Sequence, residues 1–231
     1  MHYLGAKQRV AKHIIEYLNQ YSTCEILYEP FVGACNVGIK TNFKYFKCSD
    51  IHPDLILMWQ ALQKGWIPPK DCTETEYQTM KLQEASALRG FIGFGVSFSG
   101  KWFGGYARDN TGRNYTKNAF NSVSKKIANK NFYTAEFKCI NFLTYDWSNI
   151  KDAVFYCDPP YLNTTKYSNQ FNHDLFWEKV RELSKFNVVV VSEYQAPADF
   201  KCVLEIPTKL DMHSKLGQVE RIERLFEYVR S

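Results

Sequence analysis

Short apolar runs alternate with longer amphipathic segments along this chain, and the two periodicities predict strands and helices in turn. Buried strands are predicted where an apolar run ends in polar residues, at 153–157 and 187–192. Further strands are expected at the start of segment 25–38 and at 45–50, 132–140, 203–206 and 225–229. Apolar residues at helical spacing predict helices at 8–21, 55–62, 74–88, 117–129 and 174–184. Such alternation is typical of an α/β fold with a largely parallel sheet.

The composition fits one domain with a substantial insertion. The chain has 231 residues, of which 45% are hydrophobic and 16% aromatic, enough to fill a core. No long apolar segment and no basic-then-apolar leader is present, so we expect neither a membrane span nor a secretory signal. The seven cysteines are scattered without a CxxC pair, which indicates reduced thiols in a cytoplasmic protein and no zinc site.

The stretch Asp158-Pro159-Pro160-Tyr161 directly follows the strand predicted at 153–157. The prolines restrict the backbone, so a carboxylate, carbonyl oxygens and an aromatic ring are held together at the end of a strand. In an open α/β sheet this edge is where ligands bind. Such an array suits a planar amino group on a base, with Tyr161 as a stacking surface. An ordinary turn after a strand is the alternative.

Two earlier segments have the layout of a nucleotide-binding site. Residues 25–38 read Glu-Ile-Leu-Tyr-Glu-Pro-Phe-Val-Gly-Ala-Cys-Asn-Val-Gly and predict a strand, a glycine-containing turn and a helix. Asp50 ends the next predicted strand about 20 positions after the turn, where dinucleotide-binding folds place the carboxylate that binds ribose hydroxyls. Asp50 is equally well placed to cap the helix expected near Pro53, and the two roles are compatible. The turn alone is weak evidence, because such glycines often serve packing.

Positive charge is concentrated in residues 89–130. Eight basic residues stand there against Asp109, a net charge of +7, whereas the whole chain carries +5, so the remainder is slightly acidic at −2. Glycines and aromatic residues are interleaved in the same stretch, which favours a hairpin and loops that mould to DNA. A solvated basic loop is the alternative.

With these features in this order, the sequence resembles the Dam-like DNA adenine-N6 methyltransferases, the α-class or D12 family. Tyr3-Leu4-Gly5-Ala6-Lys7-Gln8 is similar to the family's first cofactor motif, and residues 29–38 are similar to its S-adenosylmethionine loop. Ser49-Asp50-Ile51 is similar to its ribose motif, and residues 158–161 to its catalytic motif. The resemblance covers nearly the whole chain. Cys35 and Asn36 replace the commoner Gly-Ser type residues of the loop.

The resemblance implies a Rossmann-like S-adenosylmethionine-dependent methyltransferase sheet with helices on both faces, formed by residues 1–57 and 131–231. It implies an inserted, mostly helical DNA-recognition domain with a hairpin loop at 58–130. The implied activity is site-specific methyl transfer from S-adenosylmethionine to N6 of an adenine flipped out of duplex DNA. The implied catalytic residues are Asp158, Pro159, Pro160 and Tyr161. The implied cofactor-binding residues are Tyr3, Lys7, Glu29, Phe31, Gly33, Cys35, Asp50, Ile51, Phe142 and Asp158.

The expected DNA contacts lie in the basic stretch. They are Arg89, Lys101, Arg108, Arg113, Asn114, Lys125, Lys126 and Lys130. The forked guanidinium groups of Arg108 and Arg113 suit guanine edges, and Asn114 suits an adenine. The lysines at 125, 126 and 130 suit phosphates, which position a duplex without specifying its sequence. The loop 162–172 is expected to lie over the target base, with Tyr167 as its lid residue.

Three other activities stay open at this point. Cytosine-N4 methylation uses nearly the same chemistry, although Ser often replaces the acidic residue of its catalytic motif. RNA adenine methylation is open because a basic surface does not distinguish the nucleic acids. A nucleic-acid-binding homologue without catalysis is the third. The resemblance implies the cytoplasm of a bacterial or phage-infected cell, with no membrane, metal or obligate protein partner. It leaves open the recognised DNA sequence, the oligomeric state, and a solitary, phage or restriction-modification context.

Overall fold

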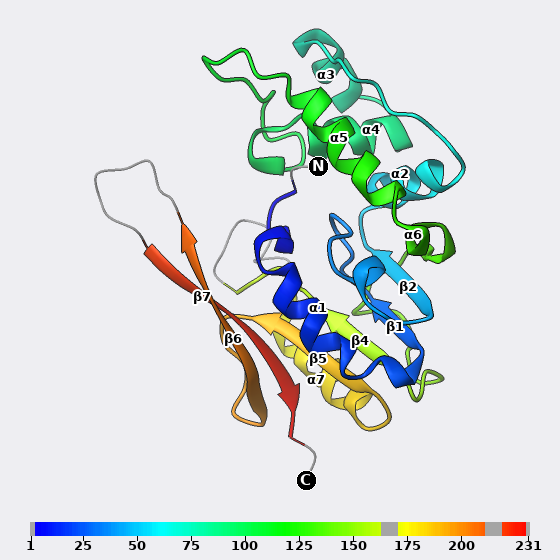
Figure 1. Cartoon of the computed structure of the whole chain (residues 1–231), viewed down its shortest axis with the longest axis vertical. Coiled ribbons are helices and arrows are strands. Elements are labelled where there is room, and N and C mark those ends of the chain that lie inside the picture. Colours follow the sequence, from blue (N-terminus) through cyan, green and yellow to red (C-terminus); the bar gives the residue numbers. More distant parts are fainter. Residues whose placement is uncertain (1–2, 163–170, 211–218, 230–231) are drawn as a thin grey trace.

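A seven-stranded sheet organises the chain in this computed structural model, which describes residues 3–162, 171–210 and 219–229 (Figure 1). The strands are β1 (Ile26–Glu29), β2 (Tyr45–Asp50), β3 (Glu136–Cys139), β4 (Val154–Cys157), β5 (Val188–Glu193), β6 (Phe200–Leu210) and β7 (Val219–Tyr228). Their order is β3-β2-β1-β4-β5-β7-β6. The first five are parallel, and β7 runs antiparallel to β5 and β6. The chain therefore changes direction across the sheet between β1 and β4, the switch point where ligands bind in open α/β sheets.

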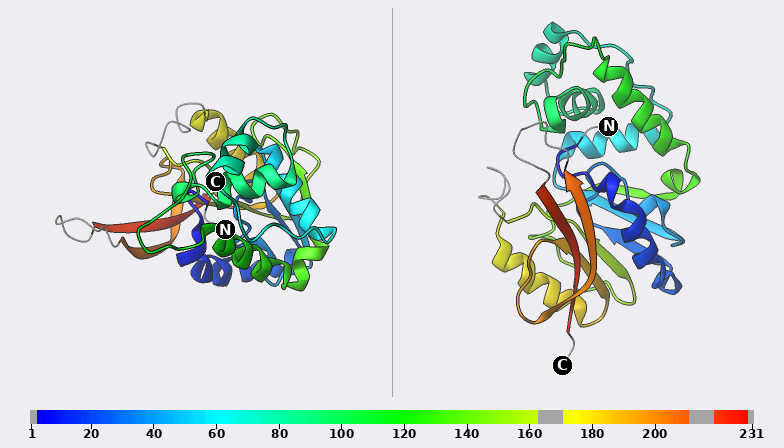
Figure 2. Two further views of the ribbon diagram at one scale, coloured as in Figure 1. Left: turned by 90° about the horizontal axis from the view of Figure 1, so that it is seen from above. Right: turned by 60° about the vertical axis from the view of Figure 1, so that its left-hand side comes forward.

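Apolar side chains cover both faces of this sheet. In β4, Val154 and Tyr156 join one core cluster, while Phe155 and Cys157 join another on the opposite face. This is the two-residue alternation of a strand buried on both sides. Helices α1 (Ala11–Asn19) and α2 (Pro53–Gln63) contribute to the first cluster, and α7 (His173–Ser184) contributes to the second. Figure 2 shows α1 and α7 on opposite faces, so the expected Rossmann-like fold with helices on both faces is confirmed.

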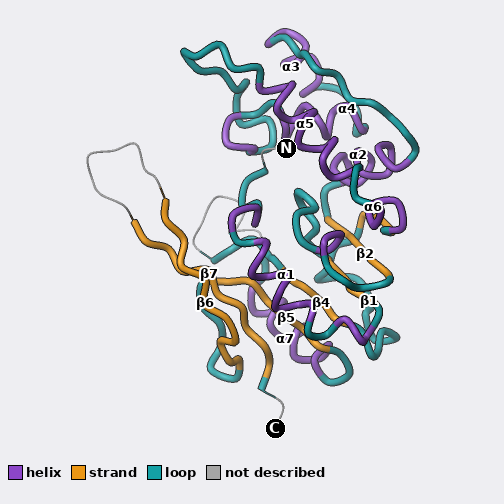
Figure 3. The backbone as a smooth tube through the Cα atoms, viewed as in Figure 1, coloured by secondary structure: helices purple, strands orange, loops and turns teal. Residues whose placement is uncertain are grey.

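Three of the remaining helices, α3 (Glu74–Lys81), α4 (Ala87–Gly95) and α5 (Tyr115–Ile127), gather at one end of the molecule, whereas α6 (Lys130–Thr134) packs beside β2. Figure 3 shows α3, α4 and α5 grouped away from the strands. This group lies within the insertion expected at 58–130, although the expected boundary at 57/58 falls inside α2. Gly90 of α4 packs directly on α2, because a Cβ there would lie 2.2 Å from the carbonyl oxygen of Asp54.

The structure corrects four details of the predicted elements. The helix expected at 74–88 is two helices, because Thr73 caps α3 and the Ser86 side chain caps α4 by accepting from Arg89 N. The turn after β1 leads only to a short 3₁₀ helix, Gly38–Lys40, rather than an α-helix. The strand expected at 132–140 begins as α6 and becomes β3 only at Glu136. The expected closing strands extend further and form the long β6–β7 pair.

The basic stretch contains a reduced form of the expected hairpin. Its ladder is a single antiparallel bridge between Ser97 and Tyr106. Backbone bonds from Phe98 N to Gly105 O and from Ala107 N to Val96 O flank this bridge. In the described part of the chain, no helix is long and apolar enough to cross a membrane.

Candidate active site

Acidic residues end four of the five parallel strands. Glu29, Asp50 and Glu193 are the last residues of β1, β2 and β5, and Asp158 directly follows β4. Parallel strands bring their carboxyl ends to one edge, so these side chains share that edge. Burial raises the pKa of Glu29 to about 8, of Glu193 to about 7, and of Asp50 and Asp158 to about 6. The edge therefore concentrates carboxyl groups that gain from cationic or hydrogen-donating partners.

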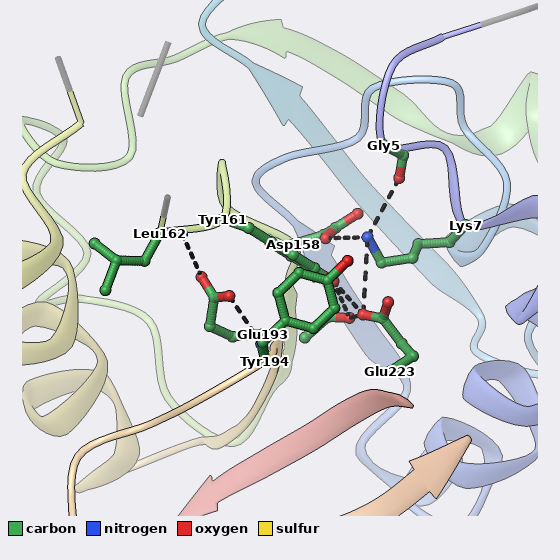
Figure 4. A network of polar contacts seen from close by, with 9 residues as sticks. Gly5, Lys7, Asp158, Tyr161, Leu162, Glu193, Tyr194 and Glu223 are labelled. Carbon is green, nitrogen blue, oxygen red and sulfur yellow. Dashed lines mark hydrogen bonds and ion pairs between the residues drawn. The ribbon is translucent and has the colours of Figure 1, made fainter. Parts of the chain in front are cut away.

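Lys7 provides such a partner to Asp158 (Figure 4). Its Nζ lies 2.6 Å from Asp158 Oδ1 and 3.9 Å from Glu223 Oε1 of β7, and it donates to the carbonyl oxygen of Gly5 at 3.2 Å. Burial alone would lower the pKa of Lys7, but the two carboxylates outweigh this effect and the pKa lies above its ordinary value. Lys7 is therefore a buried cation that keeps Asp158 oriented.

Tyr161 belongs to the same network. Its hydroxyl donates to Glu223 and lies 3.0 Å from Ser192 Oγ, which itself donates to Glu223 at 2.6 Å. The Lys7 ammonium lies 4.4 Å from the centre of the Tyr161 ring. The ring is only 9% exposed. Glu223 thus fixes the orientation of Tyr161, and the cation occupies part of the ring surface that the sequence predicts for base stacking.

Glu193 holds the chain that follows residues 158–161. Its carboxylate accepts from Leu162 N at 3.2 Å and from Tyr194 N at 2.8 Å. The Tyr194 ring meets the Tyr161 ring edge-on at 4.7 Å between centroids. Pro159 is buried and Pro160 is exposed. Most of the loop expected over the target base, including Tyr167, lies outside the described residues.

The β1 loop, residues 30–37, lies between β1 and the 3₁₀ turn at Gly38. Glu29 accepts from Gly38 N at 3.0 Å, and Asp50 accepts from Gly33 N at 3.0 Å. Gly33 adopts φ +43°, and a Cβ there would lie 2.8 Å from the ring of Tyr3. The glycine therefore permits both the backbone conformation and the close contact with Tyr3. Four of the residues expected at the cofactor lie together in this arrangement: Tyr3, Glu29, Gly33 and Asp50.

The other residues expected at the cofactor differ in accessibility. Ile51 is 62% exposed beside Asp50, and Phe31 is half-buried. Phe142 is 2% exposed, and its ring packs against Phe31 at 5.2 Å between centroids. The Cys35 thiol is buried, which raises its pKa to about 12. Ile51 and Phe31 therefore have accessible apolar surface, whereas Phe142 and Cys35 face the core.

The residues expected to contact DNA divide into two groups. Five are exposed basic residues: Lys101, Arg108, Arg113, Lys125 and Lys130. The other three, of which Asn114 is also exposed, make contacts that support the fold in the described structure. Arg89 is bound to Asp54 at 2.9 Å, and the Asn114 side chain caps α5 by accepting from Lys117 N at 2.7 Å. Lys126 is 6% exposed and donates to the β1 loop. The exposed basic group is accessible to a phosphate or a base, for which Arg108 and Arg113 would exchange their ion pairs with Glu74 and Asp109.

Two acidic residues of the site were not predicted. Glu193 carries the same signal as Asp50 and Asp158, because a carboxylate follows the apolar run 188–191. Glu223 carries no such signal, since it is one of several charged residues in β7 and only the pairing of β7 with β5 brings it to the site.

Comparison with known proteins identifies the family of this chain. The model of the D12 class N6 adenine-specific DNA methyltransferase family matches residues 3–91 and 103–198. A DNA adenine methylase of Haemophilus influenzae is 28% identical over 193 residues, which are 71% of this chain and 64% of that protein. A DNA adenine methylase of Vibrio cholerae is 29% identical over 160 residues, 60% of this chain and 58% of that protein. The match thus spans less than two thirds of each relative. The family match covers well over half of this chain, which therefore belongs to the D12 class N6 adenine-specific DNA methyltransferase family.

Proposed function

We propose that this protein transfers a methyl group from S-adenosylmethionine to N6 of adenine in DNA. The observation that carries the proposal is the position of Asp158. Its carboxylate lies at the switch point of the sheet, 2.6 Å from Lys7 Nζ and directly before Pro159-Pro160-Tyr161. The family match and the two DNA adenine methylases support the same activity.

Adenine N6 is a poor nucleophile because its lone pair is delocalised into the ring. Asp158 and the carbonyl oxygen of Pro159 are two acceptors at one place, and each accepts one N6–H bond. Holding both hydrogens in this way favours a tetrahedral nitrogen whose lone pair is available. Lys7 keeps the Asp158 carboxylate in place, so the protein contributes positioning and electrostatic stabilisation. The reaction forms the N6–methyl bond, breaks the sulfur–methyl bond, and releases one N6 proton through the hydrogen bond to Asp158.

The residues at the edge fit the proposed cofactor, which supplies the electrophilic methyl group when bound. The Asp50 carboxylate accepts backbone N–H groups, at Oδ2 from Gly33 and at Oδ1 from His52, and a carboxylate has further acceptor capacity for a ribose hydroxyl. The exposed side chain of Ile51 offers apolar surface beside it. The buried carboxyl groups of the edge favour a ligand with cationic groups, and S-adenosylmethionine has a sulfonium and an amino group.

The exposed basic residues of the insertion expected at 58–130, called the recognition segment below, support duplex DNA as the partner. Lys101, Arg108, Arg113, Lys125 and Lys130 are spread over the loop before α5, α5 itself and the start of α6. Such residues bind phosphates and base edges. The target adenine must leave the duplex to reach Asp158, which costs a few kcal/mol that these contacts help to offset.

The test is methyl transfer from labelled S-adenosylmethionine to matched duplexes in which adenine or cytosine is the only methylatable base. We expect N6-methyladenine in duplex DNA. Transfer to cytosine would indicate N4 chemistry, and preference for a matched RNA would indicate an RNA enzyme. Cofactor binding without transfer to any substrate would indicate a homologue that binds without catalysis. Sequencing methylated positions in DNA from a host that expresses the protein identifies the recognised site.

A further inference from the structure

The β1 loop is irregular in backbone and almost completely buried. Residues 32–39 are all buried, although the loop between β1 and Gly38 has no α-helix or strand. Buried backbone carbonyl and amide groups require partners, because an unpaired group carries the full cost of losing water. In this loop several of the partners come from other elements. Asp50 of β2 accepts from Gly33 N, and Trp59 of α2 donates to Gly33 O at 3.1 Å.

Lys126 supplies another such partner from the recognition segment. Its Nζ donates to the carbonyl oxygen of Cys35 at 3.0 Å and to Asn36 Oδ1 at 2.6 Å. The side chain is 6% exposed, and burial lowers its pKa to about 8. The neighbouring Lys125 on the same helix is exposed. Adjacent lysines of α5 therefore have different environments, one inside the molecule and one in solvent.

The contact falls where the loop reverses direction. Cys35 adopts φ +52°, a left-handed conformation that is uncommon for a residue with a side chain. Its amide donates to Val32 O at 2.7 Å and closes the turn. The ammonium of Lys126 binds the next groups along the chain, Cys35 O and the Asn36 side chain. Lys126 is thus the partner that holds the second half of the loop in its turned conformation.

We propose that Lys126 is a positioning residue that fixes the β1 loop for S-adenosylmethionine, and that it is not a DNA contact. The inference rests on the proposed function, because it assigns the loop to that cofactor. It links a helix of the recognition segment to the cofactor side of the site through one side chain.

The experiment compares Lys126→Met with Lys125→Met, which make the same change in charge and length at adjacent positions. For Lys126→Met we expect the Kd for S-adenosylmethionine, measured by calorimetry without DNA, to rise about tenfold or more, as for losing hydrogen bonds to a charged group. Amide hydrogen exchange across residues 33–38 should become faster, while duplex DNA affinity keeps its salt dependence. Lys125→Met should leave cofactor affinity and loop exchange unchanged and reduce the salt slope of DNA binding by about one unit.

Lys126→Arg, which retains donors, should recover part of the cofactor affinity. At saturating cofactor Lys126→Met should retain nearly normal kcat, so that the defect lies in KM for the cofactor. If Lys126→Met does not fold, Asn36→Ala removes one of the two acceptors alone, and a several-fold rise in Kd with faster loop exchange is then expected.

Cofactor affinity and loop exchange that stay at wild-type values in a folded Lys126→Met or Asn36→Ala protein would overturn the inference. A salt dependence of DNA binding that is reduced in Lys126→Met as much as in Lys125→Met would also overturn the inference. Failure of the wild-type protein to bind S-adenosylmethionine would instead refute the proposed function, and would refute the cofactor role of Lys126 with it. The exchange comparison would still establish separately whether Lys126 holds the loop.

Discussion

Two ion pairs of similar length lie in different surroundings, one buried and one exposed to solvent. Lys7 and Asp158 approach to 2.6 Å, with side chains 8% and 18% exposed. Arg108 and Glu74 approach to 3.0 Å in the recognition segment, with side chains 73% and 45% exposed. Attraction between charges is strong where water is excluded and weak where it is not. The buried pair therefore fixes geometry, whereas the exposed pair can be exchanged for another partner at little cost.

The proposed function requires a preorganised site together with recognition of a large polymer, and the two regions differ accordingly. Asp158, Lys7 and Glu223 are held before any ligand arrives, so little reorganisation is needed during the reaction. Arg108 and Arg113 pair with Glu74 and Asp109 on the surface, and a phosphate or a guanine edge can replace these carboxylates. Changes in the buried region should therefore alter turnover, and changes in the exposed region should alter DNA binding.

The largest expected effect is that of Asp158→Ala. The change removes the acceptor proposed for the amino group of the flipped base, so turnover should be abolished while duplex DNA binding stays nearly intact. Single-turnover methyl transfer and fluorescence anisotropy measure the two properties. Near-normal turnover in this variant would show that residues 158–161 are not the catalytic motif.

The fall of kcat/KM at low pH should follow the protonation of Asp158. Burial raises the pKa of Asp158 to about 6, and only its ionised form accepts hydrogen bonds at both oxygens. We expect kcat/KM to be nearly constant above this pH and to fall about tenfold per unit below it. Rates measured from pH 5 to pH 8, with the folded state monitored by circular dichroism, test the prediction. An acid limb centred near pH 4 would exclude Asp158 as the group responsible.

Glu223→Gln should produce the next largest effect. The amide keeps the shape of the side chain and one acceptor oxygen, but this neutral oxygen is a weaker acceptor for the Tyr161 and Ser192 hydroxyls than the carboxylate. We expect kcat to fall because the transition state loses roughly 1–3 kcal/mol of stabilisation, as for a disturbed buried hydrogen bond. Tyr161→Phe, which retains the ring and loses only the hydroxyl, is the matched variant and should have a similar defect. Normal kcat in both variants would remove this network from catalysis.

Asp50→Ala should lower the affinity for the cofactor. Loss of the carboxylate removes the acceptors proposed for ribose hydroxyls, and we expect S-adenosylmethionine affinity to fall at least tenfold, about 1.4 kcal/mol. Calorimetric titration measures the change. Asp50→Asn is the control for loop structure, because it retains an acceptor for Gly33 N. Unchanged cofactor affinity in Asp50→Ala would limit Asp50 to supporting the β1 loop and the start of α2.

The smallest effects should come from the exposed region. Arg108→Ala should cost about 1 kcal/mol on the recognised sequence and relax site preference if its guanidinium reads a base. Lys130→Ala should weaken all sequences alike and flatten the salt slope by about one unit. Competition between matched and mismatched duplexes at several salt concentrations separates the two behaviours. If both variants lose affinity equally for matched and mismatched duplexes, this segment binds DNA only electrostatically and the base-reading residues lie elsewhere.

The sequence predicts the parts of the site that are local in the chain. Asp158 and Asp50 each follow a short apolar run, so one segment carries both the strand and the side chain at its end. Glu223 could not be predicted in this way, because its position depends on which strand lies beside β5. Lys126 carried a signal that its charge obscured. The buried positions Ala119, Val123 and Lys126 of α5 are spaced by four and three residues, which places the lysine on the inner face of the helix.

The network around Asp158 joins residues from near both ends of the described chain. Lys7 precedes α1, and Glu223 lies in β7, which reaches the site only by pairing with β5. Asp50 and the β1 loop depend instead on contacts with β2, α2 and Lys126 of α5, all of which precede β7 in the chain. During synthesis the cofactor side of the edge can therefore form long before Glu223 leaves the ribosome. In a chain whose β7 strand has separated from β5, we expect S-adenosylmethionine still to bind but methyl transfer to cease. Methyl transfer would therefore require that β7 is paired in the sheet.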